Sequence, residues 1–313
     1  MSQRSALAGY VVRRLGMAVA VLFTISLVSF FLLKLSGDLA TSLARDSSAS
    51  YVEFLRRQYG LDQPIIVQYG QWLGRALTGD LGTSFYFNEP VATLFAARLP
   101  VTMLLSLMAI GLALLVSLPL GILAALNEDR LGDRLIQLFA LSGQAMPVFW
   151  SSYLFIIFFA LQLKVLPISG GASLAGLVMP ALTLALFTMP ALLRITRAGM
   201  SDALASDYVR TARAKGLRWG VIVVRHALRN ALIPLIGISA VQFGLLLGGS
   251  VVVETIFAID GIGYFSWQAI SQNDFPVVQA TVLVVSTFYV LLTLAADLLS
   301  AWIDPQFKIG GRA

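Results

Sequence analysis

The sequence predicts an all-α polytopic membrane protein with six transmembrane helices and a long external loop after the first helix. Hydrophobic residues make up 58% of the 313 residues and charged residues only 12%, whereas soluble domains carry about 25% charged residues. The chain also contains several apolar runs, each close to the ~20 residues that cross a hydrocarbon core. Most of its charges lie between these runs, where segments outside the bilayer are expected.

The composition excludes several classes of function. The net charge is +6, but the bases lie in the segments between apolar runs, where they set membrane topology, so nucleic acid is not an expected partner. The chain has no Cys and a single His, His226, which argues against disulfides, iron–sulfur clusters and thiolate or histidine metal sites. No GxxxxGK[ST] motif occurs, so any ATP used must be bound by another protein. We therefore expect no catalytic residues and no cofactor.

The first predicted span is Leu15–Leu33, which follows the short basic segment 1–14 and contains no charged residue. A cleavable signal peptide is the alternative interpretation. The apolar run is too long for an ordinary signal peptide, and no clear A-x-A cleavage site follows it. The sequence therefore favours a retained span with a cytoplasmic amino terminus.

The predicted external loop covers residues 34–98. It contains a short amphipathic helix over Tyr51–Tyr59, which Gly60 ends, and a second helix over residues 61–77 with Pro64 near its start. Residues 79–85 (GDLGTSF) are typical of a turn.

Five more spans are predicted, several of them interrupted by proline. Pro119, Pro147, Pro180 and Pro190 each remove a backbone donor from an apolar run, which favours a kink or a break. The segment between the last two spans, residues 254–274, contains three acids and no base. The predicted spans are Leu99–Asn127, Leu135–Leu163, Leu174–Leu193, Asn230–Val253 and Phe275–Ile303.

The distribution of basic residues predicts the orientation. Eight of the 22 Lys and Arg residues lie between Arg194 and Arg229, whereas the short predicted external loops contain only Lys164. Because basic loops of membrane proteins stay on the cytoplasmic side, both termini and the segment 194–229 are predicted to be cytoplasmic.

The most basic stretch runs from Asp207 to Pro234, with Asp207 as its single acid. Its residues favour a short helix outside the bilayer that ends at Gly216. A loop that only obeys the positive-inside rule would explain the charge. It would not require Ala212, Ala214 and Gly216, which are predicted to leave a small face for close packing in a partner's cleft.

A family resemblance becomes specific here. The runs DYVRTARAKGL and RHALRNALIP resemble the cytoplasmic loop of ABC-importer permeases, most closely the B-type subunit of the peptide/nickel permease family. Ala212 and Gly216 match the small residues of that loop, and Pro234 matches its second proline. Arg210 and Arg229 stand where more distant importers have Glu and Pro, and the peptide/nickel branch shares both departures.

The resemblance implies a type I ABC-importer permease fold, with residues 1–313 as one transmembrane domain and residues 194–229 as a loop that docks on a separate ATPase. It implies a bacterial inner-membrane protein that works with a second homologous permease, two ABC ATPase subunits and an extracytoplasmic solute-binding protein. Peptide import is the favoured function, with nickel or another small solute as the alternative. The bases of the loop could also contact membrane lipid. The implied coupling residues are Asp207, Tyr208, Arg210, Thr211, Ala212, Arg213, Ala214, Lys215, Gly216 and Arg225.

Other parts of the chain also resemble the family. Residues 37–40 (GDLA) stand where the family has GDPA, and 304–307 (DPQF) match its last motif. In segment 254–274, Ile259 and Asp260 replace a Trp-Pro pair before the glycines Gly261 and Gly263. These glycines favour a tight turn, with the surrounding aromatics at the membrane interface: Phe257, Tyr264, Phe265 and Trp267.

The translocation path is predicted to include Gln242, Ser250 and Glu254. The glycines Gly244, Gly248 and Gly249 of the same span favour helix packing over a role in the path. An acid inside a span is a functional candidate by default, but Asp297 lies near the end of its span, where a structural bond is equally expected. His226 is interpreted as a polar residue at the junction of loop and helix.

Two other classes of function are alternatives. A secondary transporter driven by an ion gradient usually carries ionisable residues at mid-membrane and internal repeats, neither of which the sequence shows clearly. A membrane scaffold or sensor would not need proline-interrupted spans, although the pattern alone leaves it open.

Overall fold

The computed structural model describes residues 3–36, 48–58, 60–169 and 173–303, and every regular element within these ranges is helical. Five helices are long and apolar enough to cross a membrane, and a sixth span results if one bent helix pair is counted as a unit. The six-span, all-helical prediction is thereby confirmed. The long helices are α1 (Gln3–Ser36), α5 (Val91–Leu126), α8 (Leu174–Ala205), α11 (Leu228–Gly249) and α14 (Phe275–Ile303).

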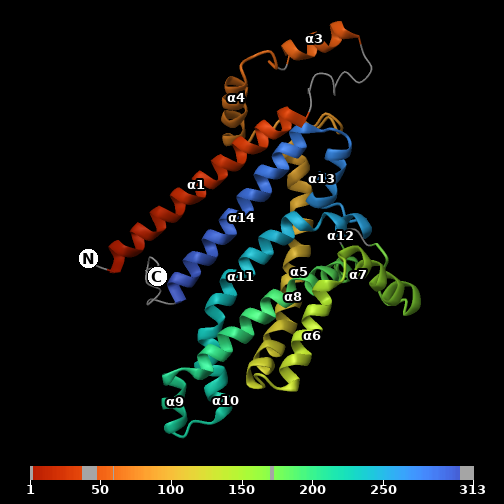
Figure 1. Ribbon diagram of the computed structural model, residues 1–313. Helices are drawn as coiled ribbons and strands as arrows, with labels where there is room; N and C mark the ends of the chain where they lie inside the picture. The colour runs from red at the N-terminus through yellow and green to blue at the C-terminus, as the bar shows by residue number, and fades with distance from the viewer. Residues whose placement is uncertain (1–2, 37–47, 59, 170–172, 304–313) are drawn as a thin grey trace.

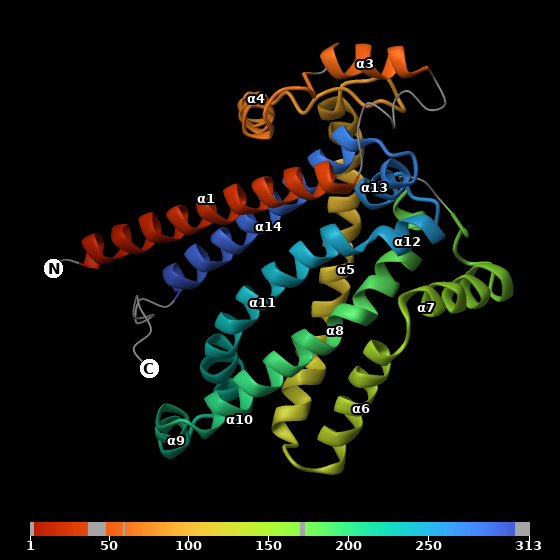
Figure 2. The same ribbon diagram turned by 45° about the horizontal axis from the view of Figure 1, so that its top comes forward.

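The centre of the molecule is the crossing of α5 and α8 (Figure 1). Fully buried Leu105 on α5 and Leu192 and Leu193 on α8 belong to the largest apolar cluster. Helices α6 (Leu131–Ala145) and α11 also pack on α8, and α1 lies along α14 on the side away from α6 (Figures 1 and 2). The pair α1–α14 is tied near its end by an ion pair of 3.0 Å between Arg14 and Asp297. This contact gives Asp297 a structural partner.

The bent pair arises at Pro147, where the sequence predicted an interruption. Proline has no N–H group and disfavours the helical conformation of the residue before it, and Met146 is extended, with φ −78° and ψ 131°. The chain therefore turns by 98° between α6 and the helix formed by α7 (Val148–Phe155) and the π-helical turn Ile156–Gln162 (Figure 2). The second half runs across the end of α8 instead of continuing α6.

Several helices extend beyond the predicted boundaries of their spans. Helix α5 begins at Val91, eight residues before the predicted start at Leu99, because Pro90 directly precedes its first turn. Helix α6 begins at Leu131, so most of the predicted loop 128–134 is helical. Helix α8 continues to Ala205, and residues 194–205 of the predicted loop extend it.

The two short helices predicted after the first span are confirmed as α3 (Ala49–Gln58) and α4 (Ile65–Leu77). Gly60 adopts a positive φ of 61° after α3, and Pro64 directly precedes α4. The Tyr69 hydroxyl hydrogen-bonds Ser26 at 2.9 Å, which attaches α4 to α1. Residues 37–40, Tyr59 and 304–307 lie outside the described ranges.

Two glycines of α11, Gly244 and Gly248, serve helix packing, whereas Gly249 has no atom within 4 Å of its Cβ position. A Cβ on Gly244 would overlap the ring of Tyr289 on α14, and one on Gly248 would lie 3.5 Å from Val285. This close approach supports the packing interpretation of the GxxxG spacing.

Replacing Gly244 by leucine is expected to destabilise the protein by about 1–3 kcal/mol, because the added side chain must separate α11 from α14. The matched control is Gly237→Leu on the same helix, where a Cβ would have no atom within 4 Å. Thermal unfolding of the purified proteins measures the difference. Equal unfolding midpoints for the two variants would contradict the packing role.

Candidate functional site

A small helical unit closes one end of the molecule, beyond α8 and α11 (Figure 1). It consists of α9 (Asp207–Ala214) and α10 (Trp219–Val221), followed by the π-helical turn Ile222–Ala227. Ser206 separates α9 from α8 with an extended backbone. Gly216 follows α9 with φ +73°, a conformation that glycine adopts without steric cost, so the predicted short helix and its stop are confirmed. We refer to this end as the α9 end.

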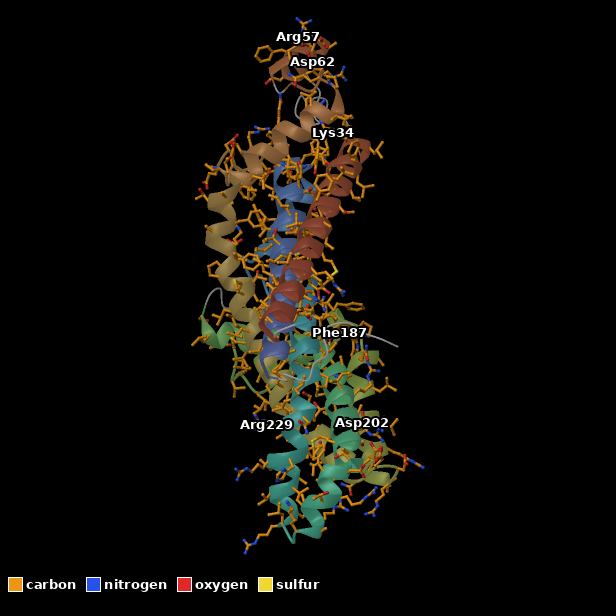
Figure 3. All side chains as sticks on the ribbon, turned by 90° about the vertical axis from the view of Figure 1, so that its left-hand side faces the viewer. Lys34, Arg57, Asp62, Phe187, Asp202 and Arg229 are labelled. Carbon is orange, nitrogen blue, oxygen red and sulfur yellow. The ribbon has the colours of Figure 1, made fainter. Side chains whose placement is uncertain are left out.

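The two ends of the molecule carry exposed charges, and an apolar region separates them. Figure 3 shows Asp202 and Arg229 near the α9 end, Arg57 and Asp62 at the opposite end, and Phe187 between them. This arrangement places α9 outside the apolar, membrane-crossing part of the helices.

One face of α9 packs against its own chain. Val209 and Ala212, three residues apart and so on one side of the helix, are buried against Ile222. The prediction that Ala212 contributes to an outward small face was therefore wrong. Its small side chain instead allows the segment that carries Ile222 to approach α9. Ala214 and Gly216 are exposed, and a Cβ on Gly216 would have no atom within 4 Å.

The outward face of α9 is basic. Arg210, Arg213, Lys215 and Arg218 are exposed. The pair between Arg210 and Asp207, 3.1 Å apart, is fully solvated on both sides and contributes little stability. The Arg213 guanidinium lies 4.1 Å from the ring centroid of Trp219, which holds the turn after α9 against the helix.

Helix α9 is attached to two long helices at once. The Asn230 side chain, in the first turn of α11, donates a 2.8 Å hydrogen bond to the Tyr208 hydroxyl. Val223 and Ala227, in the turn before α11, pack with Met200 and Ala203 of α8. Helix α9 is therefore connected to α11 through Asn230 and to α8 through the turn Ile222–Ala227. Arg225 is exposed and His226 partly exposed in the same turn.

A buried ion pair next to this unit was not predicted. Asp133 of α6 is 1% exposed and accepts two hydrogen bonds of 2.7 Å from the Arg197 guanidinium of α8. Gln137 donates to the same carboxylate at 2.7 Å, and the Asp129 N–H donates at 3.1 Å. Such bidentate, charge-assisted bonds fix helix geometry strongly. The sequence feature that could have indicated this ion pair is an acid in the first turn of an apolar helix, within a stretch that was predicted to be a loop.

At the opposite end, the three acids of segment 254–274 all hold that segment to earlier parts of the chain. Asp260 pairs with Arg98 at 2.8 Å. The Asp274 carboxylate accepts a 2.5 Å bond from the Ser84 hydroxyl and a 3.2 Å bond from the Phe85 N–H. The acidic bias of this segment therefore has a structural origin in the described part of the chain.

Glu254, in the short helix α12 (Val251–Ile256), is the centre of the third contact. It is fully buried, and its carboxylate accepts bonds from Thr102 at 2.9 Å, from Ser250 at 2.7 Å and from the Tyr264 N–H at 2.9 Å. A Cβ on Gly261 would come within 2.5 Å of this carboxylate. Gly261 thus lies in the tight turn between α12 and α13, where its N–H donates to the Ile259 carbonyl at 2.9 Å, and its φ of −106° shows that close packing, not a left-handed backbone, requires the glycine.

The aromatic residues of segment 254–274 divide into two groups. Phe257 and Phe265 are fully buried, so their predicted place at the membrane interface was wrong. They fill the apolar clusters beneath α13 (Ile262–Ser271). Trp267 is half exposed and stacks on Tyr264 with a centroid distance of 6.1 Å.

The predicted path residues do not converge on one cavity in this subunit. Ser250 and Glu254 are buried and bonded to each other. Gln242 is partly exposed on α11, about 12 Å along the helix axis from Ser250. Its side chain remains available to a neighbouring subunit or a pathway.

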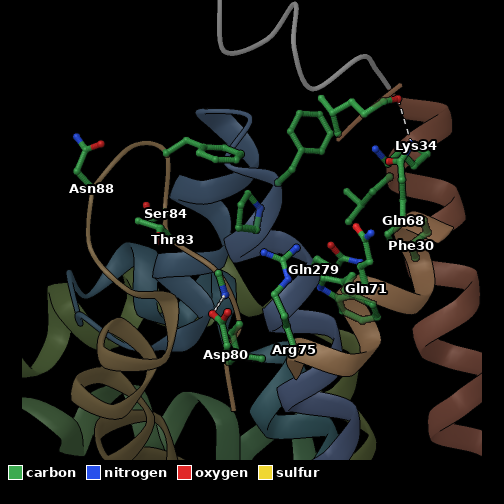
Figure 4. Close-up of a pocket in the computed structure, with 18 residues that line it drawn as sticks. Phe30, Lys34, Gln68, Gln71, Arg75, Asp80, Thr83, Ser84, Asn88 and Gln279 are labelled. Carbon is green, nitrogen blue, oxygen red and sulfur yellow. Dashed lines mark hydrogen bonds between the residues drawn. The ribbon is translucent and has the colours of Figure 1, made fainter. Parts of the chain in front are cut away.

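A crevice of about 480 Å³ lies between α1, α4 and the start of α14, far from α9 (Figures 1 and 4). Figure 4 shows Arg75, Gln71 and Gln279 extending into it. The Nε2 atom of Gln279 is buried without a hydrogen-bond partner among the described residues. Polar groups thus line the crevice at the end that carries α3 and α4.

The Glu254→Gln variant is expected to lose about 1–3 kcal/mol of stability, because an amide cannot accept from all three donors and its NH₂ group would face another donor. The exposed acid Glu89 offers a matched control, Glu89→Gln. Limited proteolysis around α13, together with thermal unfolding, checks the effect. If both variants behaved alike, Glu254 would not hold α13 in place.

Comparison with known proteins agrees with this arrangement. Residues 117–309 match the family described as "Binding-protein-dependent transport system inner membrane component", and residues 7–106 match the corresponding N-terminal family. The chain is 38% identical over 308 residues to a protein of Brucella abortus (strain 2308) named as a peptide transport system permease, covering 95% of this chain and 98% of that one. It is 38% identical over 301 residues to the glutathione transport system permease protein GsiC of Escherichia coli (strain K12), covering 96% of this chain and 98% of that protein.

A solved structure shares the fold. An inward-facing structure of the MetNI methionine ABC transporter aligns with a TM-score of 0.56 and 16% identity, covering 67% of this chain and 96% of that one.

Proposed function

Because the chain belongs to the family of inner membrane components of binding-protein-dependent transport systems and is therefore the permease subunit of an ABC importer, we propose that it forms half of a peptide pathway and couples that pathway to a separate ATPase. Family membership makes it a multi-pass inner-membrane protein that works with an ATPase and a binding protein. The observation that carries the coupling proposal is the connection of α9 to α11 through Asn230, and to α8 through the turn Ile222–Ala227 that packs on both helices.

The coupling surface consists of the exposed residues of α9 and the turn after it. Ala214 and Gly216 leave room for a partner's backbone, and Arg210, Arg213 and Lys215 supply charge for acidic partner groups. Exposed Tyr208 and buried Ala212 connect α9 to the rest of the chain, through Asn230 and Ile222 respectively. Asp207 and Thr211 shape the first turn of the helix, and Arg225 extends the basic surface.

The assembly that fits this surface contains one copy of this chain, a second homologous permease, two ATPase subunits and an extracytoplasmic binding protein. The basic α9 end, together with both termini, lies in the cytoplasm under the positive-inside rule. Closure of the ATPases on ATP would push on α9 and move α8 and α11 as rigid bodies, which switches access between the two sides. Gln242 lines the path, and Ser250 and Glu254 set the geometry of its outer end.

Peptides are the proposed substrates, including small ones of the glutathione type. The support is the pair of full-length relatives, which are named for peptide and for glutathione transport. Specificity in such a system would be shared with the binding protein.

Co-purification tests the assembly. The tagged chain, extracted in mild detergent from its native membrane, is expected to bring down a second permease and P-loop ATPases, identified by mass spectrometry. In proteoliposomes, this complex should take up peptide only with ATP and the binding protein, and ionophores should leave uptake unchanged. A chain that purifies alone, with uptake that ionophores abolish, would instead support a gradient-driven transporter.

A further inference from the structure

A groove of about 470 Å³ lies between α6 and α8, on the side of the molecule away from α1 and α14. One wall comes from a single face of α6, with residues spaced three and four apart. The other comes from one turn of α8. The lining residues are Arg134, Gln137, Leu138, Ala140 and Leu141 of α6, and Pro190, Leu193 and Arg194 of α8.

The two arginines of this groove have no ion-pair partner within the described residues. Two nearby acids are already engaged, because Asp133 binds Arg197 through both oxygens and Glu128 lies 3.8 Å from the same guanidinium. Arg134 and Arg194 are both exposed. The groove therefore presents two uncompensated guanidinium groups, which favour a phosphate or carboxylate ligand.

The arginines mark the boundary between the polar and apolar parts of both helices. Between Arg134 and Arg194 the chain carries a single charged residue, Lys164. Leu138, Leu141 and Leu193 line the groove beyond the arginines. Leu138 and Leu141 are each more than half exposed. A ligand that satisfies both parts has an anionic end and an apolar body.

We propose that this groove binds an anionic phospholipid of the cytoplasmic leaflet. The head-group phosphate contacts Arg134 and Arg194, and the first carbons of an acyl chain lie over Leu138 and Leu141. Because the Gln137 Nε2 donates to Asp133, its carbonyl oxygen is left to accept a head-group hydroxyl. The assignment to the cytoplasmic leaflet, where anionic lipids attract basic residues near the surface, rests on the orientation proposed above.

The position of the lipid gives it a structural consequence. Arg134 directly follows Asp133, and Arg194 lies one helical turn before Arg197. A phosphate that bridges Arg134 and Arg194 would thus join α6 and α8 one turn from their buried ion pair. The lipid would reinforce the junction from which α8 runs on to α9.

Lipid retention in the assembled importer tests the site. The complex is placed in phosphatidylcholine nanodiscs with increasing phosphatidylglycerol, and bound phosphatidylglycerol is counted by native mass spectrometry. Each lost arginine should weaken retention about fivefold, and Arg134→Gln with Arg194→Gln together about 25-fold, as expected for the attraction of two basic side chains to an anionic head group. The control Arg130→Gln removes the same charge from an exposed position outside the groove and should change retention less than about twofold.

Two further arms identify the occupant without weakening the fold. Glycerol phosphate and inorganic phosphate should not displace the lipid, because they lack the apolar body; displacement by either would reveal a site for free anions only. A photoreactive residue in place of Leu138 should crosslink to phospholipid, and a crosslink to another subunit would overturn the proposal. Peptide uptake by the same complexes, measured with ATP, tests the importer function separately, since a complex could retain the lipid and yet fail to transport.

Discussion

Replacing Gly216 by tryptophan is expected to weaken strongly the coupling between ATP hydrolysis and peptide uptake while the protein still inserts as a membrane protein. Gly216 is exposed, and apart from its two neighbours no atom of the described residues lies within 4 Å of where its Cβ would be. The large side chain therefore starts in open space on its own chain and would clash with an ATPase docked at the proposed surface. Overpacking a close contact costs about 1–3 kcal/mol, which corresponds to roughly 5- to 150-fold weaker docking. The measurements are uptake and ATPase rates of the reconstituted importer.

Two control variants distinguish a clash with the docked partner from backbone strain at position 216. The φ of +73° at Gly216 strains any residue with a Cβ, but asparagine tolerates this conformation best, so Gly216→Asn should keep most of the uptake. Gly220→Trp places the same bulk on α10, also with no atom near its Cβ. If tryptophan and asparagine at position 216 impaired uptake equally, the backbone and not docking would be responsible. Normal uptake by Gly216→Trp would place the docking surface elsewhere.

The features that the sequence predicted correctly depend on local signals. The end of α9 at Gly216, the break at Pro147 and the start of α4 after Pro64 each follow from the backbone chemistry of one residue. The six spans follow from the alternation of apolar runs and charge. These signals act within a few residues, so no knowledge of the rest of the fold was needed.

The features that were missed depend on contacts between distant segments. Hydropathy falls at Arg194, which suggested the end of the fourth span, but α8 continues to Ala205, and Arg197 in this extension is paired with Asp133, 64 residues earlier in the chain. Ala212 is small enough for either face of α9, and only the position of Ile222 determines that it points inward. The pattern of one element could not supply either fact.

The same reasoning explains segment 254–274. The sequence placed this acidic segment between two spans, but it did not show that Glu254 and Asp274 are fully buried and bonded to groups more than 150 residues away in the chain. Thr102 and Ser84 gave no sign of this role in the sequence, since an isolated hydroxyl residue is common in helices and turns. A carboxylate can replace its hydration with several donors only where the fold brings them together.

Removing the carboxylate of Asp133 is expected to have the largest effect on stability. In Asp133→Ala, the Arg197 guanidinium would remain mostly buried, with only Glu128 at 3.8 Å to offset its charge. Breaking a buried ion pair from one side costs about 3–5 kcal/mol, because an uncompensated charge is left in a region of low polarity. Thermal unfolding of the assembled importer measures this loss, and Asp202→Asn, which alters an exposed acid of α8, should have almost no effect.

The double variant Asp133→Ala, Arg197→Met distinguishes the stability lost through an uncompensated buried charge from the stability lost with the contact itself. Replacing both partners by apolar groups removes the uncompensated guanidinium, so most of the lost stability should return. Uptake should not return with it, because the α6–α8 junction would no longer be fixed by bidentate bonds of 2.7 Å and force on α9 would be absorbed by movement of α8. A double variant as unstable as Asp133→Ala would show that shape, not charge, holds the two helices together. Restored uptake along with restored stability would show that apolar packing alone transmits the motion.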